Sequence, residues 1–237
     1  MSISALNSFR DIQKFLAEFL SQPLTITGIY IVVKFDCQSG EDAFFSPTSL
    51  ANLLYLIYVL QTNDLKVIIG YASIYIPLFA SVGAYAGATG LFTSQKRFSL
   101  STFQPSVRKG GSKRVQRYFS TKLNLCLKMT ELNTLRKLDP KQTIMNGLDR
   151  TDQFYDIDSP ELQNPNQESW QMWDALKSLS SQFSNDIPQN IAKYKRHIEN
   201  AIALGKLCNK RLEEPLNLQA LEDMDKALST FIKYAEL

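Results

Sequence analysis

The chain has 237 residues, a net charge of +3 and a single histidine, His197, which excludes a metal site built from several imidazoles. Its three cysteines, Cys37, Cys126 and Cys208, are odd in number and lack CxxC spacing, which favours thiols in a reducing compartment over a disulfide framework. There is no glycine-rich phosphate loop, dinucleotide fingerprint or other catalytic motif, so we expect no enzymatic activity, no cofactor and no metal.

The first segment, residues 1–42, predicts an amphipathic helix followed by a short strand. Ser8 is placed to cap the helix, whose apolar residues recur at spacings of three and four: Phe9, Ile12, Phe15, Leu16, Phe19 and Leu20. Apolar side chains then alternate within residues 24–35, which favours a strand over a third membrane span of only fifteen uncharged residues.

Residues 43–95 contain two long uncharged runs, and they dominate the interpretation. Ala43–Asn63 and Val67–Gln95 carry no Asp, Glu, Lys, Arg or His. At ~1.5 Å per residue, a helix of 29 residues exceeds the ~30 Å hydrocarbon core of a bilayer. Only three residues separate the runs, so the sequence predicts a transmembrane helical hairpin with both flanks on one side of the membrane.

A second interpretation needs no membrane. Val67–Phe79 and Leu53–Leu60 are rich in Ile, Val, Leu and Tyr, and short apolar runs of this kind also form the buried strands of an α/β protein. The length of the second run makes the membrane interpretation our main expectation.

Small residues fill the second half of that run. They form a small-xxx-small pattern, which in a membrane helix lets two backbones approach closely. We therefore expect helix packing, and possible homo-oligomerisation, through Ala80, Gly83, Ala84, Gly87 and Gly90.

Residues 96–130 predict a basic juxtamembrane segment, because residues 93–130 contain nine basic residues and no acid. The positive-inside rule then puts the C-terminal domain on the cytoplasmic side, or on the matrix or stroma side of an organelle. Contact with lipid headgroups or another anionic partner is expected from Lys96, Arg97, Arg108, Lys109, Lys113, Arg114 and Arg117. Interleaved aromatic residues leave nucleic acid as a less favoured partner. Alternating leucines predict a short strand near residues 123–128, which could pair with the one at 24–35.

Residues 131–237 predict a helical domain on the inner side. A leucine stripe beginning near Met129 ends before Pro140, and three helices follow, starting near Gln167, Asp186 and Leu218. Asp186 is placed to cap the second of them. The first has Trp170, Trp173, Leu176, Leu179 and Phe183 on its expected inner face. The break at Pro215 makes the last two an αα-hairpin, and their stripe either forms core or docks a partner helix through Leu221, Met224, Leu228 and Phe231.

The fold class expected from the sequence is thus a mainly α membrane protein: a transmembrane hairpin with a C-terminal soluble helical bundle and two possible short strands. We expect an integral membrane adaptor or accessory subunit whose bundle holds a protein partner or neighbouring subunits beside the lipid bilayer. A small oligomeric pore or toxin-like membrane protein is the first alternative. A soluble α/β protein of unknown activity is the second.

Overall fold

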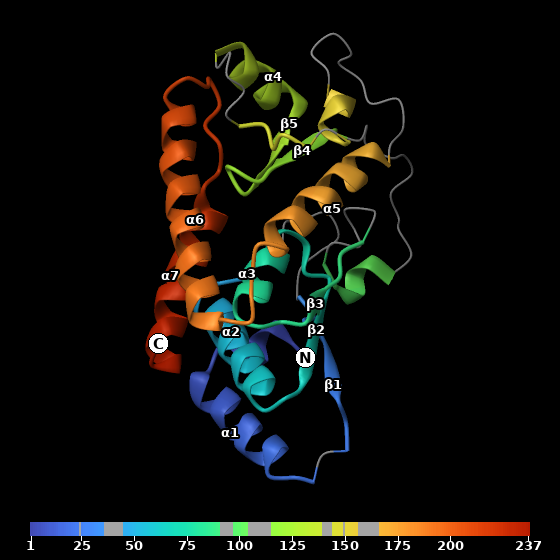
Figure 1. Cartoon of the computed structure of the whole chain (residues 1–237), viewed down its shortest axis with the longest axis vertical. Coiled ribbons are helices and arrows are strands. Elements are labelled where there is room, and N and C mark those ends of the chain that lie inside the picture. Colours follow the sequence, from blue (N-terminus) through green and yellow to red (C-terminus); the bar gives the residue numbers. More distant parts are fainter. Residues whose placement is uncertain are drawn as a thin grey trace. The chain divides into compact units, whose positions relative to one another are not determined.

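The structure is a computed structural model, and it describes residues 1–23, 25–35, 45–90, 97–103, 115–138, 144–148, 150–155 and 166–237. The chain divides into two compact units. Figure 1 labels the helices and strands that they contain. Unit 1 comprises Met1–Gln104, Phe183–Lys195 and Glu222–Leu237, and unit 2 comprises Pro105–Gln182 and Arg196–Leu221. Both units therefore combine segments that lie far apart in the sequence.

Unit 1 contains a parallel three-stranded sheet in the order β1–β2–β3. The strands are β1 (Gly28–Val32), β2 (Lys66–Gly70) and β3 (Ala86–Gly87). Helix α2 (Pro47–Thr62) lies between β1 and β2 in sequence, and α3 (Ile76–Ser81) lies between β2 and β3. Parallel strands need such crossovers, and because right-handed crossovers are nearly universal, both helices cover the same face of the sheet.

Helix α2 begins where the sequence supplies a capping serine and a proline. The Ser46 Oγ accepts a hydrogen bond from the Ser49 backbone N–H at 3.1 Å, and Pro47 occupies the first turn. Two polar side chains in the helix are buried and bonded to the N-terminal segment. The Ser49 hydroxyl donates to the Asn7 side-chain Oδ1 at 2.8 Å, and the Asn52 side-chain amide donates to the Leu6 backbone carbonyl at 2.7 Å. The polar residues at the start of the uncharged run thus bond α2 to residues 6 and 7, near the amino terminus of the same chain.

The transmembrane hairpin expected at residues 43–95 is wrong. Helix α2 has 16 residues, so its length of about 24 Å falls short of the ~30 Å bilayer core. The longer run is not one helix, because it forms β2, the short α3 and β3 in succession. Its lack of charge reflects a parallel strand, with Val67 and Ile69 buried against the helices, rather than contact with lipid.

Among the described residues, no helix is both long enough and apolar enough to cross a membrane. The expected fold class, a mainly α membrane protein, is therefore wrong, and the chain is mixed α/β. The integral membrane localisation, the membrane-anchored adaptor or accessory subunit, and the pore alternative are wrong for the same reason. The second alternative, an α/β protein, agrees better with the structure.

The remaining helices of unit 1 pack through aromatic contacts. Helix α1 (Phe9–Leu20) begins after Ser8, whose side chain accepts from the Asp11 N–H, as the sequence predicts. The Phe9 ring stacks on Tyr234 of α7 (Gln219–Ala235) with centroids 3.8 Å apart. Residues from the start and the end of the chain thereby share one core.

Unit 2 contains an antiparallel pair, β4 (Arg117–Ser120) and β5 (Leu125–Lys128), followed by α4 (Met129–Leu138) and α5 (Gln167–Ser180). Strands were expected near 24–35 and 123–128, and β1 and β5 lie in these regions. The expected pairing between them is wrong, because β5 pairs with β4 and β1 with β2.

Helix α6 (Ile187–Asn209) and α7 both contribute residues to the two units. The Asp186 carboxylate accepts from the Gln189 N–H at 3.0 Å, which confirms the predicted cap of α6. The segment boundaries that the sequence suggested at residues 42, 95 and 130 stay a prediction. The membrane-spanning role given to residues 43–95 is wrong.

Candidate functional site

The best candidate for a functional site is a pocket of about 650 Å³ in unit 1. Its size falls within the range of small-molecule sites, ~300–1,000 Å³. Strand β1 contributes to it together with the residues that follow β1 and β2, so it lies toward the carboxyl end of the parallel sheet, where ligands of open α/β sheets commonly bind. It is lined by Met1, Ser2, Tyr30, Val32, Lys34, Tyr71 and Phe98.

Strand alternation determines which side chains of β1 reach the pocket. Ile31 and Val33 are buried on the face covered by the helices. Successive side chains of a strand point to opposite faces, so Tyr30, Val32 and Lys34 project from the other face. Tyr30 is 57% exposed there, which is unusual because parallel sheets are generally covered on both faces.

Gly70 on β2 allows the Tyr30 ring to lie across the sheet. A Cβ atom built at Gly70 would clash with the Tyr30 hydroxyl and would lie only 2.7 Å from its Cζ. A larger residue at position 70 would therefore displace the ring. Gly70 thus fixes one wall of the pocket through close backbone approach.

The backbone is strained where β2 ends. Tyr71 and Ser73 have φ values of 58° and 46°, in the left-handed region that non-glycine residues seldom adopt. Such a conformation costs about 1–3 kcal/mol per residue and persists only where the surroundings enforce it. Here it turns the chain sharply after Gly70 and places the Tyr71 ring 5.4 Å from the Phe98 ring, forming a second aromatic wall.

Lys34 is held by main-chain bonds on both sides. Its N–H donates to the Met1 carbonyl at 2.8 Å, and its carbonyl accepts from the Ile3 N–H at 2.9 Å. On the opposite side, the Phe35 N–H donates to the Phe98 carbonyl at 2.9 Å. The resulting parallel bridges, from Lys34 to Ser2 and to Phe98, fix the direction in which the lysine side chain leaves the backbone.

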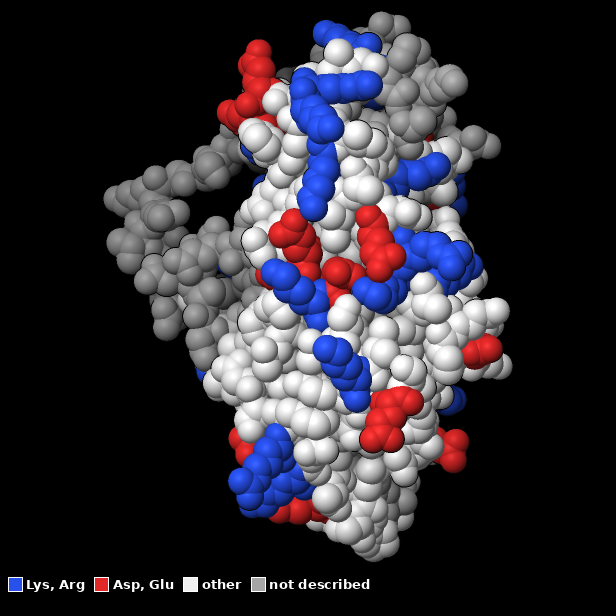
Figure 2. All heavy atoms as spheres, turned by 90° about the vertical axis from the view of Figure 1, so that its left-hand side faces the viewer, with Lys and Arg blue, Asp and Glu red and all other residues white. Residues whose placement is uncertain are grey.

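The basic residues expected to contact lipid or an anionic partner do not form a described site. Arg97 precedes the pocket residue Phe98 in unit 1, whereas Arg117 begins β4 in unit 2. Lys96, Arg108, Lys109, Lys113 and Arg114 lie outside the described residues. On the face shown in Figure 2, basic and acidic side chains are interspersed, so its described residues form no field of a single sign.

The five small residues expected to pack one helix against another do not share a helix. Ala80 lies in α3, Gly83 and Ala84 lie in the turn after it, Gly87 lies in β3, and Gly90 follows that strand. The residues expected to dock a partner helix all lie in α7 and are fully buried: Leu221, Met224, Leu228 and Phe231.

The pocket residues were missed because the sequence places them far apart. Alternation through Tyr30 and Val32 does predict a strand. The signal that could have located the site was a second strand at Val67–Ile69, since the ends of parallel strands meet at one edge of a sheet.

Unit 2 contains a buried polar cluster around Tyr118. Its hydroxyl donates to the Asp152 carboxylate at 3.0 Å and accepts from the Asn146 N–H at 2.8 Å. Burial, reinforced by the Asp152 charge, raises the pKa of the Tyr118 phenol far above its ordinary range. The other Asp152 oxygen accepts two backbone N–H groups, from Gly147 and Leu148. These bonds tie a loop to β4, so we interpret the cluster as structural.

The histidine and two of the three cysteines, which the sequence offers as candidate metal ligands or reactive groups, lie in unit 2. His197, in α6, is half-buried. Cys126 lies in β5 and Cys208 in α6, whereas Cys37 lies outside the described residues. Within the described part of the chain, no group of three or more His, Cys, Asp or Glu residues is arranged to hold a metal ion.

Comparisons with known proteins identify no relative: no family model, no curated protein and no solved structure matches the chain. The functional argument therefore rests on the pocket itself.

Proposed function

We propose that this protein binds a small, planar, largely apolar ligand in the pocket at the carboxyl end of its parallel sheet. The observation that carries the proposal is the convergence of three aromatic rings, from Tyr30, Tyr71 and Phe98, on one pocket. Aromatic walls provide a large contact area and offset or edge-to-face contacts for a planar ring.

The strain at Tyr71 and Ser73 supports the same proposal. Two left-handed non-glycine residues at the end of the central strand are costly for stability, and strained backbone concentrates at sites that hold ligands. At this turn the Tyr71 ring lies 5.4 Å from the Phe98 ring.

The lining favours binding over catalysis. Among the described residues, the seven that line the pocket include no carboxylate, thiol or imidazole to act as a general base at neutral pH. We therefore propose a binding protein and name no catalytic residue.

The test is a fluorescence titration with N-phenyl-1-naphthylamine, an uncharged dye with two aromatic systems. We expect saturable binding that weakens by about tenfold in Tyr71→Ala, because loss of a ring contact of ~1.4 kcal/mol changes the Kd tenfold. Trp173→Ala is the matched control, since Trp173 is an exposed aromatic residue (38%) in unit 2, and the dye should bind this variant as it binds the parent.

Circular dichroism and the urea midpoint establish that each variant is folded before its titration. Absence of saturable binding to the parent protein would overturn the proposal. So would equal affinities of the parent and Tyr71→Ala, or a loss caused by Trp173→Ala instead.

A further inference from the structure

Among the described residues at the ends of the parallel strands, basic side chains outnumber acidic ones. In the described ranges 25–35, 64–73, 84–90 and 97–103, which contain the three strands and the residues at their ends, the charged residues are Lys34, Lys66, Arg97 and Asp64. Asp64 lies with Lys66 at the amino end of β2, whereas the pocket lining contains Lys34. A ligand in the pocket meets this cation, which favours an anion.

The two lysines lie at opposite ends of the strands. Lys66 begins β2, and its ammonium lies 5.0 Å from the centre of the Tyr85 ring, in a cation–π contact at the amino end. Lys34 follows β1 and lines the pocket at the carboxyl end. Of the two, Lys34 is therefore the cation that a ligand in the pocket would meet.

The backbone structure around Lys34 determines the side of the sheet on which its side chain lies. Its neighbours Val33 and Phe35 are buried on the helix side, so strand alternation directs Lys34 to the pocket side. The parallel bridges to Ser2 and Phe98 hold its backbone. A lysine fixed beside aromatic walls can hold a charged group of a ligand while the rings contact the ligand's planar part.

We infer that the ligand is an aromatic anion, whose ring lies between Tyr30 and the Tyr71–Phe98 wall and whose carboxylate, sulfonate or phosphate group lies at Lys34. This inference rests on the proposed binding of a planar ligand and adds its charge. Selectivity for the anion comes from Lys34, and the rings supply affinity that does not depend on charge.

The experiment compares two dyes with the same anilinonaphthalene ring system, the sulfonate 8-anilinonaphthalene-1-sulfonate and the uncharged N-phenyl-1-naphthylamine. We expect the parent protein to bind the sulfonate about tenfold more tightly than the uncharged dye, with a preference that weakens as salt is added. Lys34→Gln should abolish the preference, because it should weaken binding of the sulfonate about tenfold more than binding of the uncharged dye. Lys66→Gln is the matched control and should retain the preference.

The outcomes separate the two proposals. If the uncharged dye binds at the pocket but the sulfonate shows no preference, or if the preference persists in Lys34→Gln, the inference about charge is wrong and the binding function stands. If a preference disappears in Lys66→Gln instead, the anion lies elsewhere and the inference is again wrong. If neither dye binds saturably, both proposals fail.

Discussion

Gln171 of α5 uses both ends of its side-chain amide to satisfy the backbone of Phe119 on β4. Its Oε1 accepts from the Phe119 N–H at 3.0 Å, and its Nε2 donates to the Phe119 carbonyl at 2.9 Å. A glutamine side chain thus occupies the place that a neighbouring strand would take at the edge of β4. Gln171 is fully buried, so in the folded protein these backbone groups are bonded to a side chain and not to solvent.

Replacing Gln171 with alanine should destabilise the protein by about 1–3 kcal/mol, because the buried Phe119 N–H loses its partner. The Phe119 carbonyl keeps a second partner, the Asn146 side-chain amide at 2.8 Å. Urea unfolding followed by circular dichroism measures the change. Gln153→Ala is the control: Gln153 is exposed and makes one bond, to the Arg150 carbonyl at 2.9 Å. The control should change stability by less than ~0.5 kcal/mol. Equal effects of the two substitutions would contradict the role given to Gln171.

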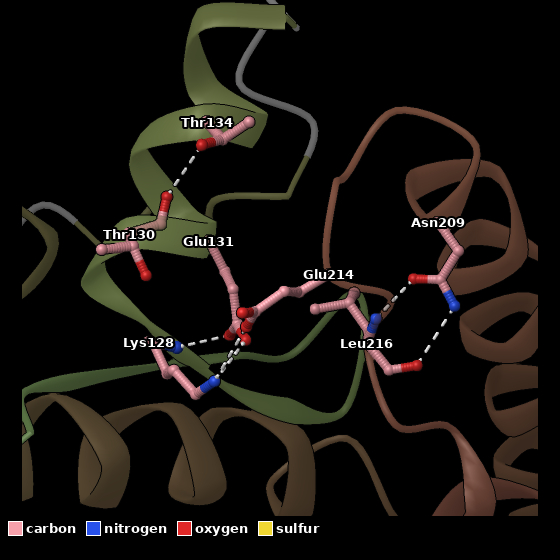
Figure 3. A network of polar contacts seen from close by, with 7 residues as sticks. All are labelled: Lys128, Thr130, Glu131, Thr134, Asn209, Glu214 and Leu216. Atoms are coloured by element: carbon pink, nitrogen blue, oxygen red, sulfur yellow. Dashed lines mark hydrogen bonds and ion pairs between the residues drawn. The ribbon is translucent and has the colours of Figure 1, made fainter.

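The loop between α6 and α7 depends on Asn209 (Figure 3). Its Oδ1 accepts from the Leu216 N–H at 2.7 Å, and its Nδ2 donates to the Leu216 carbonyl at 3.1 Å. Asn209→Ala should cost about 1–2 kcal/mol and speed hydrogen exchange at the Leu216 amide. Asn200→Ala, at an exposed position of the same helix, should leave that exchange rate unchanged. An unchanged Leu216 rate in Asn209→Ala would show that the loop is held by other contacts.

Figure 3 also shows the corner between β5 and α4. The Lys128 N–H donates to the Glu131 carboxylate at 2.7 Å, and the Lys128 ammonium lies 3.5 Å from Glu131 and 3.7 Å from Glu214. Because Lys128 is half exposed, we assign stability here to the backbone bond more than to the ion pairs.

A half-buried ion pair joins α6 to α7 within unit 1. The Lys195 ammonium lies 2.8 Å from Asp225, with side chains 28% and 31% exposed, and 3.0 Å from the Ser229 hydroxyl. A double-mutant cycle with Lys195→Met and Asp225→Asn should give a coupling energy of ~0.5–1 kcal/mol that decreases at high salt. The exposed pair Lys14–Glu18, at 3.8 Å, serves as comparison and should give a smaller coupling. If the exposed pair couples as strongly, burial is not what strengthens the first.

His197 should make stability depend on pH. Burial lowers the pKa of its imidazole below the ordinary 6.5, and a hydrogen bond with the Thr121 backbone partly opposes this. Below pH 6.5 the unfolded chain therefore binds more protons than the folded chain. The free energy of unfolding is at its full value above that pH and decreases as pH falls through it.

Because His197 is the chain's single histidine, His197→Gln should flatten the decrease between about pH 6.5 and 5.5, where carboxylates contribute little. Urea unfolding at half-unit pH intervals measures the slopes. Identical slopes in the parent and in His197→Gln would mean that the histidine titrates alike in both states.

Local signals in the sequence were informative. The caps at Ser8 and Asp186 and the helix that ends before Pro140 could be predicted, because each depends on residues within one or two turns. The error over residues 67–95 came from counting charges. Buried parallel strands and membrane spans both exclude charge, and the pairing of β1 with β2 is a long-range contact that leaves no local signature.

The two tryptophans of α5 show that apolar residues alone did not predict which face of this helix is buried. Leu176 and Leu179 are buried as expected, but Trp170 and Trp173 are 43% and 38% exposed. The helix is rotated so that Gln171 faces β4, because that amide satisfies a strand edge. A pattern of apolar residues does not reveal that a polar side chain will be the buried one.

The most direct test of the proposed binding site is fluorine NMR of protein labelled with 3-fluorotyrosine, titrated with 8-anilinonaphthalene-1-sulfonate. The chain has ten tyrosines, and single Tyr→Phe variants assign their resonances. We expect the resonances of Tyr30 and Tyr71 to shift together and saturably, and those of Tyr118 and Tyr194 to stay in place. Saturable binding of the dye with no change at Tyr30 and Tyr71 would contradict the account.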